Sequence, residues 1–257
     1  MVQKPWFPDA LEGACVILRR HVPENVAAFR RWYADPEIAR LARYQATPMR
    51  QEEIERFFAA RVVGPDTLAM AIHERATGRL IGTCAFSQLD GENGSALYHI
   101  TIGESDAWGR GFGTESTRLM LDHAFGTLGL HRIALYVFEF NERAIAAYRR
   151  AGFVVEGRSR ESIWRDGRWW DELAMSVLES DWRATRGTGA GVGGESALPV
   201  AGTSAAPVAG TLAAPVAGTP AAPVAVAADS GGSEAGTDQR VEAGPSDRLR
   251  RTLGRWR

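Results

Sequence analysis

Residues 108–115 read Trp-Gly-Arg-Gly-Phe-Gly-Thr-Glu, and this stretch decides how the rest of the chain is interpreted. It lies between a strand-like segment, 98–103, and a helix-like segment, 114–128. Three alternating glycines leave backbone N–H groups without Cβ cover, and such groups can form a concave anion-binding nest. The following helix adds unsatisfied N–H groups and the positive end of its dipole. The sequence predicts a phosphate-binding loop here, unless the glycines form a tight turn without a ligand.

The spacing of the glycines excludes two familiar nucleotide-binding loops. A nucleoside triphosphate loop ends in Gly-Lys followed by Ser or Thr, and no lysine follows Gly113. A dinucleotide-binding loop has the pattern Gly-x-Gly-x-x-Gly, and counting from Gly109 places Thr114 where the last glycine should stand. The loop is therefore not expected to bind a nucleoside triphosphate or a dinucleotide in either of these two ways, and another phosphate-containing ligand is expected.

Composition separates a folded part from a long tail. The chain has 257 residues, but aromatic residues vanish between about 187 and 244, where Ala, Gly, Pro, Val, Ser and Thr dominate. An octapeptide repeat in this region offers only small apolar side chains, too few to offset the entropy of ordering. We expect one domain over residues 1–183 and a disordered Ala/Pro/Gly-rich linker over 184–246.

The C-terminal segment, 247–257, differs from the linker. Leu249, Leu253 and Trp256 would share one face of a helix, and arginines crowd the same stretch. Such a basic amphipathic segment could dock on an anionic macromolecule or surface. The alternative is a frayed, solvated end, because so short a helix is unstable alone.

Charge, hydropathy and cysteine content narrow the class of protein. The formal net charge is −1, which gives no reason to expect a general affinity for nucleic acid or membranes. No apolar run approaches the length of a membrane helix, and the N-terminus lacks a signal-peptide pattern. Cys15 and Cys84 are too few for a disulfide framework or a zinc site. We expect a cytoplasmic protein without a transmembrane segment and without a metal.

Hydrophobic periodicity predicts the order strand, two helices, three antiparallel strands, helix, strand, helix, two strands. This order indicates an α+β, or three-layer α/β, fold with one mixed, mostly antiparallel central sheet flanked by helices. The expected strands are 15–20, 68–74, 79–86, 96–103, 131–138, 153–164 and 169–178, and the expected helices are 25–33, 51–62, 114–128 and 141–151.

Three motifs follow one another along the chain: G-R-G-F-G-T-E at 109–115, N-E-R-A-I-A-A-Y-R-R-A-G-F-V-V-E-G at 141–157, and D-G-R-W-W-D-E-L-A-M at 166–175. In this order they resemble the motifs of the GNAT acyl-CoA N-acetyltransferases, in particular the ribosomal-protein and spermidine acetyltransferases. The first matches the family's pyrophosphate loop, Q/R-x-x-G-x-G/A, except that Trp108 stands at the leading Gln/Arg position. The resemblance implies the GNAT fold over about 12–182, with acetyl-CoA as co-substrate.

The resemblance also implies where acetyl-CoA would lie. A backbone N–H of the strand 100–102 should polarise the thioester carbonyl where this strand separates from its neighbour. The residues expected to contact acetyl-CoA are Ile100, Thr101, Ile102, Trp108, Gly109, Arg110, Gly111, Phe112, Gly113, Thr114, Asn141, Arg143 and Tyr148.

Acetyl transfer to an amine needs a neutral amine, a polarised carbonyl and a proton for the leaving thiolate. By resemblance, Tyr148 would donate that proton as the general acid, although helical spacing alone also suits a core tyrosine. Asn141 would contact the pantetheine arm of the cofactor, a role compatible with capping its helix.

The general base is less clear from the sequence. Many relatives carry Glu where this chain has Leu97, and His99 would face the same side of that strand. Glu161 is a second candidate, and a base acting through water is a third option. Asp171 and Glu172 match a late acidic pair in the family, which either orients the amine or is a solvated hairpin charge.

The favoured function is an acetyl-CoA-dependent N-acetyltransferase acting on a primary amine, with a protein N-terminal amine of the ribosomal-protein type preferred. Alternative acceptors are a polyamine, or a small metabolite or antibiotic amine. A GNAT module that binds acyl-CoA without turnover is a different class of answer, and a tethering role would rest on the tail alone. A homodimer is a possible assembly.

Overall fold

The computed structural model of the chain describes residues 7–64 and 68–187. The predicted linker beyond residue 187 and the predicted segment 247–257 lie outside the described residues. The predicted domain limit at residue 183 falls inside a helix, α6 (Glu179–Gly187), in which Trp182 donates a hydrogen bond to Asp122.

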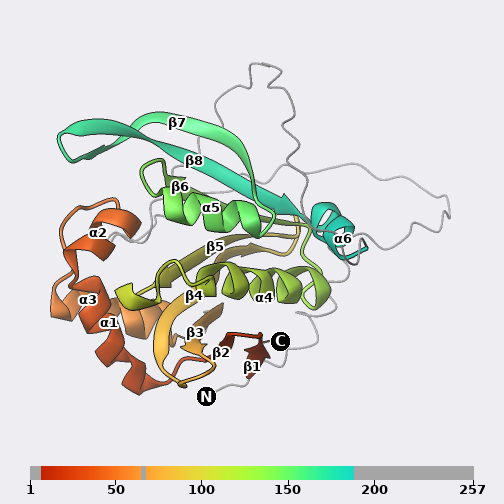
Figure 1. Ribbon diagram of the computed structural model, residues 1–257, viewed down its shortest axis with the longest axis horizontal. Helices are drawn as coiled ribbons and strands as arrows, with labels where there is room; N and C mark the ends of the chain where they lie inside the picture. The colour runs from red at the N-terminus through yellow and green to blue at the C-terminus, as the bar shows by residue number, and fades with distance from the viewer. Residues whose placement is uncertain (1–6, 65–67, 188–257) are drawn as a thin grey trace, which may run out of the picture.

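The described strands form one eight-stranded sheet in the order β1-β2-β3-β4-β5-β6-β8-β7 (Figure 1). Among the described strand pairs, β5 and β6 are parallel and the others are antiparallel, so the predicted mixed, mostly antiparallel sheet is confirmed. The strands are β1 (Ala10–Glu12), β2 (Val16–Arg20), β3 (Leu68–Glu74), β4 (Leu80–Asp90), β5 (Ser95–Ile102), β6 (Arg132–Phe138), β7 (Val154–Arg165) and β8 (Arg168–Leu178).

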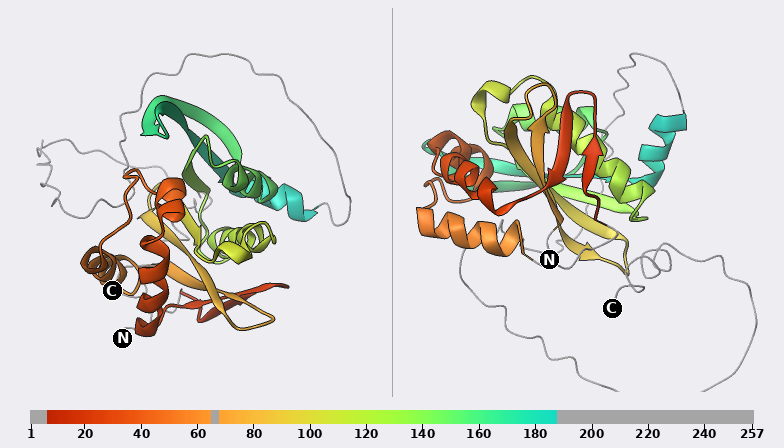
Figure 2. Two further views of the ribbon diagram at one scale, coloured as in Figure 1. Left: turned by 60° about the vertical axis from the view of Figure 1, so that its left-hand side comes forward. Right: turned by 90° about the horizontal axis from the view of Figure 1, so that it is seen from below.

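Helices pack on both faces of this sheet (Figures 1 and 2). Met120 of α4 and Ile145 of α5 join the larger core, whereas Phe29 of α1 joins a second core with Ala69 on the opposite face of β3. Apolar residues at helical spacing on α4 explain its packing. The helices are α1 (Val26–Tyr33), α2 (Pro36–Ala42), α3 (Gln51–Arg61), α4 (Phe112–Gly126), α5 (Glu142–Arg150) and α6, with 3₁₀ turns at Pro23–Asn25 and Ser105–Ala107.

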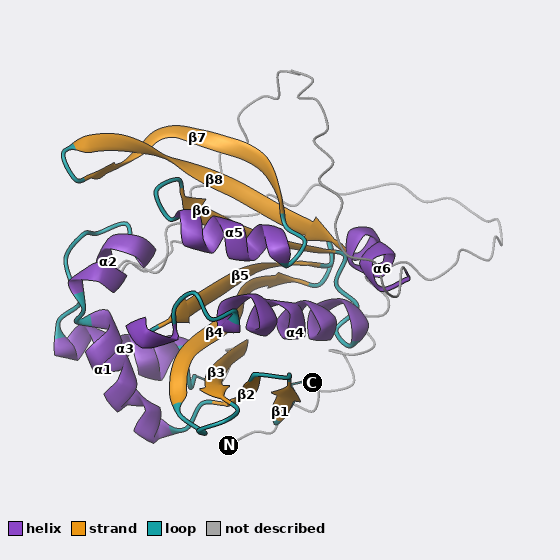
Figure 3. Cartoon of the chain, viewed as in Figure 1, coloured by secondary structure: helices purple, strands orange, loops and turns teal. Residues whose placement is uncertain are grey.

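The parallel pair β5–β6 is short, and this shortness creates the site. Residues 95–97 of β5 pair with residues 132–134 of β6. Beyond these residues both strands continue, but they no longer pair with each other. Residues 98–102 and 135–138 therefore diverge, as expected for the strand that should meet the thioester. The β7–β8 hairpin lies beyond this opening (Figure 3).

Three described elements were missing from the expected order. α2 is a short helix in which Pro36 follows Asp35, and the Asp35 carboxylate accepts hydrogen bonds from the N–H groups of Glu37 and Ile38. So short a helix has too few residues to show hydrophobic periodicity, and its cap is the main local signal. The sequence therefore predicted two helices rather than three between the first strand and β3. Strand β1 and helix α6 were also missed.

The local turn signals were read correctly. Asn141 caps α5 by accepting a hydrogen bond from Ala144 N at 3.2 Å, and Gly152 ends the helix with φ +103°. Asp166 and Gly167 both have positive φ at the β7–β8 turn, as an Asp-Gly hairpin turn requires.

Candidate active site

A cavity of about 720 Å³ opens where β5 and β6 diverge. Its described lining draws on both strands, the glycine loop, α5, and the segment that joins α2 to α3. A cavity of this size can hold an extended organic ligand.

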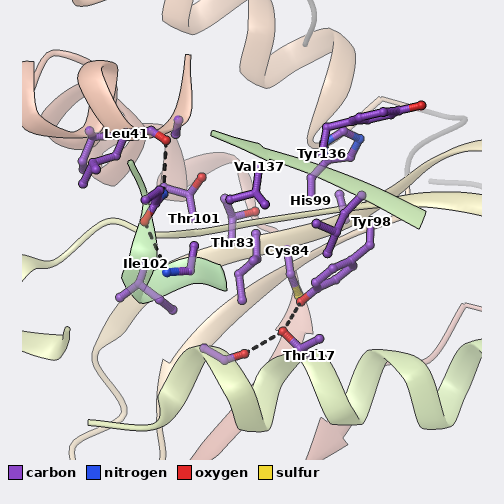
Figure 4. A pocket seen from close by; sticks show the side chains of 18 of the residues that line it. Leu41, Thr83, Cys84, Tyr98, His99, Thr101, Ile102, Thr117, Tyr136 and Val137 are labelled. Carbon is purple, nitrogen blue, oxygen red and sulfur yellow. Dashed lines mark hydrogen bonds between the residues drawn. The ribbon is translucent and has the colours of Figure 1, made fainter. Parts of the chain in front are cut away.

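Alternation along the strands sends their side chains to opposite faces of the sheet. Tyr98 faces α4, where its hydroxyl lies 3.2 Å from Thr117 Oγ1, whereas His99 lies on the other side of β5 (Figure 4). Leu135 and Val137 of β6 belong to the core under α4 and α5, while Tyr136 between them is exposed. Because the lining includes residues of both faces, the cavity passes through the sheet.

The glycine loop forms the entrance on the α4 side. Gly109 and Gly111 have φ of +75° and +85°, and a Cβ added at either would meet no protein atom within 4 Å. Helix α4 begins directly after Gly111, so the N–H groups of its first turn precede the helical hydrogen bonds. Thr114 is 8 % exposed, and its hydroxyl has no hydrogen-bond partner among the described residues. An anion such as a pyrophosphate fits this combination of open cradle and unsatisfied donor.

Trp108, which departs from the family pattern, connects the loop to two other elements. Its Nε1 donates to the Ile102 carbonyl oxygen at 2.7 Å, which ties the loop to the end of β5. The Arg143 guanidinium of α5 lies 3.9 Å from the centroid of the Trp108 ring. This cation–π contact brings a positive charge from α5 to the position where relatives carry Gln or Arg.

Arg110 and Phe112 stand apart from the other expected acetyl-CoA contacts, because neither is among the described lining of the cavity. Arg110 turns toward β3 and donates to the buried Glu74 carboxylate at 2.6 Å. Its guanidinium also lies 4.6 Å from the centroid of the Phe112 ring. These contacts hold the loop in place rather than face a ligand. The remaining expected contacts line the cavity.

Helix α5 supplies Asn141 and Tyr148 to the lining. Asn141 Nδ2 donates to the Leu41 carbonyl oxygen at 3.2 Å, which fixes the start of α5 against the end of α2. Tyr148 is 9 % exposed, and its ring packs against Phe153. Burial raises the pKa of Tyr148 above its ordinary value, so the phenol keeps its proton at neutral pH.

The two candidate bases occupy different environments. His99 lines the cavity beside Leu97, and its Nε2 lies 2.7 Å from Ser87 Oγ. Desolvation lowers the pKa of His99, so the imidazole is neutral at pH 7. Glu161 is exposed, as is His99, but it lies at an irregularity in β7 with φ +50° and is not among the described lining. The structure brings His99, but not Glu161, to the cavity.

Asp171 and Glu172, the late acidic pair, point to opposite faces of the sheet because side chains alternate along β8. Asp171 pairs with Arg158 and accepts a hydrogen bond from the Glu161 N–H at 2.8 Å. Glu172 lines the cavity, is 9 % exposed, and accepts a hydrogen bond from the Tyr44 hydroxyl. Burial raises the pKa of the Glu172 carboxyl, while the Tyr44 hydrogen bond opposes that rise. Tyr44 is the residue that sequence reasoning missed, because it lies far from Glu172 in the chain.

The chain is similar in sequence to known acetyltransferases. The family model for an acetyltransferase (GNAT) domain matches residues 16–154. The N-acetyltransferase p20 of Bacillus licheniformis, itself uncharacterised, is 26 % identical over 168 residues, which cover 64 % of this chain and 93 % of p20. Spermidine N(1)-acetyltransferase of Vibrio cholerae is 34 % identical over 107 residues, covering 42 % of this chain and 61 % of that protein.

Structural comparison gives the same fold. The spermidine N-acetyltransferase of Vibrio cholerae, solved in complex with CoA and spermine, has a TM-score of 0.60 at 23 % identity and covers 66 % of this chain and 99 % of its own. Within residues 7–64 and 68–187, no helix has the length and apolarity needed to cross a membrane.

Proposed function

This chain belongs to the GNAT acetyltransferase family, and we propose that it transfers an acetyl group from acetyl-CoA to a primary amine by direct attack. The observation that carries the proposal is the cavity through the sheet, which joins the glycine loop on one face to a polar, aromatic surface on the other. A thioester and an amine could thus approach one another from opposite faces.

The residues around the glycine loop fit acetyl-CoA, which when bound would supply the thioester carbon that the amine attacks. Gly109 and Gly111 leave room for phosphate oxygens, and the Thr114 hydroxyl is a buried donor without a protein partner in the described chain. Arg143, held over Trp108, adds a cation. The exposed N–H groups of β5 beyond residue 97, where pairing with β6 has ended, are suited to polarising the thioester carbonyl.

Tyr148 is proposed as the general acid. It lies on the face that carries α4 and α5, on the same side as the glycine loop, where the leaving sulfur would emerge. Its raised pKa keeps the phenol protonated until the thiolate forms, and the phenol can then donate its proton.

His99 is proposed as the general base, on the opposite face. Its lowered pKa leaves a ring nitrogen able to accept the amine proton at neutral pH, and Ser87 fixes the orientation of the ring. Glu161 is a weaker proposal, because its position outside the cavity lining would require a chain of water molecules to reach the amine.

The proposed acceptor is a protein N-terminal amine of the ribosomal-protein type. A polyamine site needs carboxylates for two or more cations, and Glu172 is the one acidic side chain among the described lining residues. The same lining contains four arginines, namely Arg43, Arg61, Arg143 and Arg150. This charge balance favours an acceptor with one cationic centre over spermidine.

Turnover can be tested by incubating the full chain with acetyl-CoA and a panel of amines and peptides. Release of free CoA thiol, together with a mass shift of the acceptor by one acetyl group, would support an enzyme. Acetyl-CoA binding without thiol release for any acceptor would support the alternative, a non-catalytic acyl-CoA-binding module. Leu97, which cannot accept a proton, stands where many members of the family carry Glu, and this departure favours the alternative.

A further inference from the structure

We propose that Glu172 and Tyr44 form an ammonium pocket that selects acceptors with a single positive charge. This inference deepens the proposed function and rests on it, because it names the class of amine that the cavity takes. The substrate class is a primary monoamine whose remaining atoms near the pocket are apolar, neutral or anionic.

The Glu172 carboxylate is arranged to receive a cation. Glu172 of β8 is paired with Phe138 of β6, and the two side chains lie on the same face of the sheet. This face is opposite the one that carries α4 and α5. Oε1 accepts the Tyr44 hydroxyl hydrogen bond, and Oε2 has no hydrogen bond from the described part of the chain. A carboxylate with one satisfied and one unsatisfied oxygen inside a cavity is stabilised by an incoming ammonium group.

Aromatic rings complete the pocket around this carboxylate. Tyr44 and Phe138 both line the cavity, and their ring centroids are 5.3 Å apart at an interplanar angle of 85°. Ring faces attract cations, and they also pack against the first methylene groups of an alkylamine. A protonated amine can therefore be bound by Glu172 while its carbon chain contacts Phe138.

Tyr44 is held in place by a contact from the β7–β8 hairpin. Arg165 is buried, and its Nη2 donates to the carbonyl oxygens of Arg43 and Tyr44 at 2.6 and 3.2 Å. Arg165 therefore fixes the segment after α2 against the sheet, and the Tyr44 hydroxyl is pre-positioned rather than recruited by substrate. Such pre-organisation reduces the entropy lost on binding.

The charges elsewhere in the cavity explain the preference for one cation. Arg43 and Arg61 line the same cavity, and no second carboxylate stands among its described lining residues. A diamine bound at Glu172 would leave its second ammonium group in a cavity whose other charged described lining residues are arginines. That arrangement costs free energy, whereas a terminal carboxylate at the same place would be attracted.

Three acceptors with the same five-carbon chain test this directly: n-pentylamine, cadaverine and 5-aminopentanoate. With the full chain and saturating acetyl-CoA, we expect kcat/KM for cadaverine to be at least about tenfold below that for the other two. Calorimetric titration of each amine into the CoA-saturated protein gives a binding readout that does not depend on turnover. Equal or better use of cadaverine, or of spermidine, would overturn the inference while leaving the acetyltransferase intact.

Two variants locate the effect. Glu172→Gln keeps the side-chain shape and an acceptor for the Tyr44 hydroxyl but removes the charge, so affinity for n-pentylamine should fall about 10- to 100-fold while affinity for acetyl-CoA is kept. Tyr44→Phe should cause a smaller loss of the same kind. The matched control is Glu156→Gln, because Glu156 pairs with Arg132 and does not line the cavity.

The outcomes separate this inference from the proposed function. Unchanged amine affinity in Glu172→Gln, with Glu156→Gln behaving identically, would refute the ammonium pocket even if turnover is normal. Selective monoamine binding without acetyl transfer to these amines or to any peptide of the panel would refute the catalytic proposal and keep the pocket. Absence of binding for all three amines would overturn the ammonium pocket, and only the added absence of transfer to every peptide of the panel would overturn the catalytic proposal as well.

Discussion

Replacing Gly111 with valine should separate the ligand role of the glycine loop from its role in the fold. Gly111 has φ +85°, a conformation that costs an L-residue about 1–2 kcal/mol. Because an added Cβ at this position meets no protein atom within 4 Å, that backbone strain should be the main loss of stability. For a domain of this size the midpoint of thermal unfolding should fall by about 2–8 °C.

The same open space belongs to the cavity, so the valine side chain would occupy the volume expected for a phosphate group. Loss of one or two charge-assisted hydrogen bonds corresponds to about 1.5–3 kcal/mol each, so acetyl-CoA affinity should weaken at least about tenfold. Calorimetric titration with acetyl-CoA measures this, and circular dichroism checks the fold.

Gly167→Val is the matched control. Gly167 has φ +77° at the β7–β8 turn, has equally open surroundings, and is not among the described lining residues. It should lose similar stability and keep full affinity. If the Gly111 and Gly167 variants bind acetyl-CoA equally well, the loop is only a turn and the phosphate interpretation is wrong.

Four further predictions concern catalysis, pH and the tail. Tyr148→Phe should lower kcat about 100-fold with little change in acetyl-CoA affinity, as measured by steady-state kinetics, because the ring is kept and the proton is lost; near-normal turnover would return Tyr148 to the core. His99→Gln should lower kcat/KM about 100-fold, and because desolvation lowers the pKa of His99, the acid limb of the wild-type kcat/KM profile should lie below pH 6.5. Burial lowers the pKa of His21 to about 3, so the unfolded chain takes up this proton first as pH falls. Urea titrations should then show the free energy of unfolding falling by about 2–3 kcal/mol between pH 6.5 and 4.5, less so in His21→Gln; an unchanged slope in the variant would contradict the assignment. Deleting residues 188–257 should preserve acetylation of a small amine and reduce that of a macromolecular acceptor, most at low salt, whereas equal rates would show that the tail is dispensable.

Local signals in the sequence were enough to predict β2 to β8 and helices α1, α3, α4 and α5, but not β1, α2 or α6. They also identified the glycine loop and the start of α5, which line the cavity. The glycine spacing, the Asn141 cap and the Asp-Gly hairpin turn each act within a few residues, so a reader of the sequence can find them. The amine side depends on long-range contacts. Tyr44 lies in a segment with no periodicity, and only the fold brings it against Glu172, 128 residues away.

The departure at Trp108 illustrates the same limit. In the sequence, Trp108 replaces the polar residue that begins the family's pyrophosphate-loop pattern, which weakens the match to that pattern. In the fold, Trp108 binds the Ile102 carbonyl and carries the Arg143 guanidinium on its ring. In this chain Arg143 of α5 supplies a positive charge at the loop, and a pattern of the loop residues alone cannot record that contact.

The division of the cavity by the sheet has a consequence for how substitutions should act. Tyr98, Tyr148 and the glycine loop lie on the α4–α5 side, while His99, Phe138 and Glu172 lie on the other. In the proposed mechanism the amine reaches the carbonyl carbon from one side of the sheet and the thiolate leaves on the other, so each side needs only one kind of proton chemistry. A raised Tyr148 pKa and a lowered His99 pKa suit an acid and a base kept apart in this way. Changes on the α4–α5 side should therefore alter thiolate release and cofactor binding for every acceptor alike, whereas changes on the Glu172 side should alter the ranking of acceptors. The diverging ends of β5 and β6 are the one place where the two effects should become coupled, because both reacting groups must meet there.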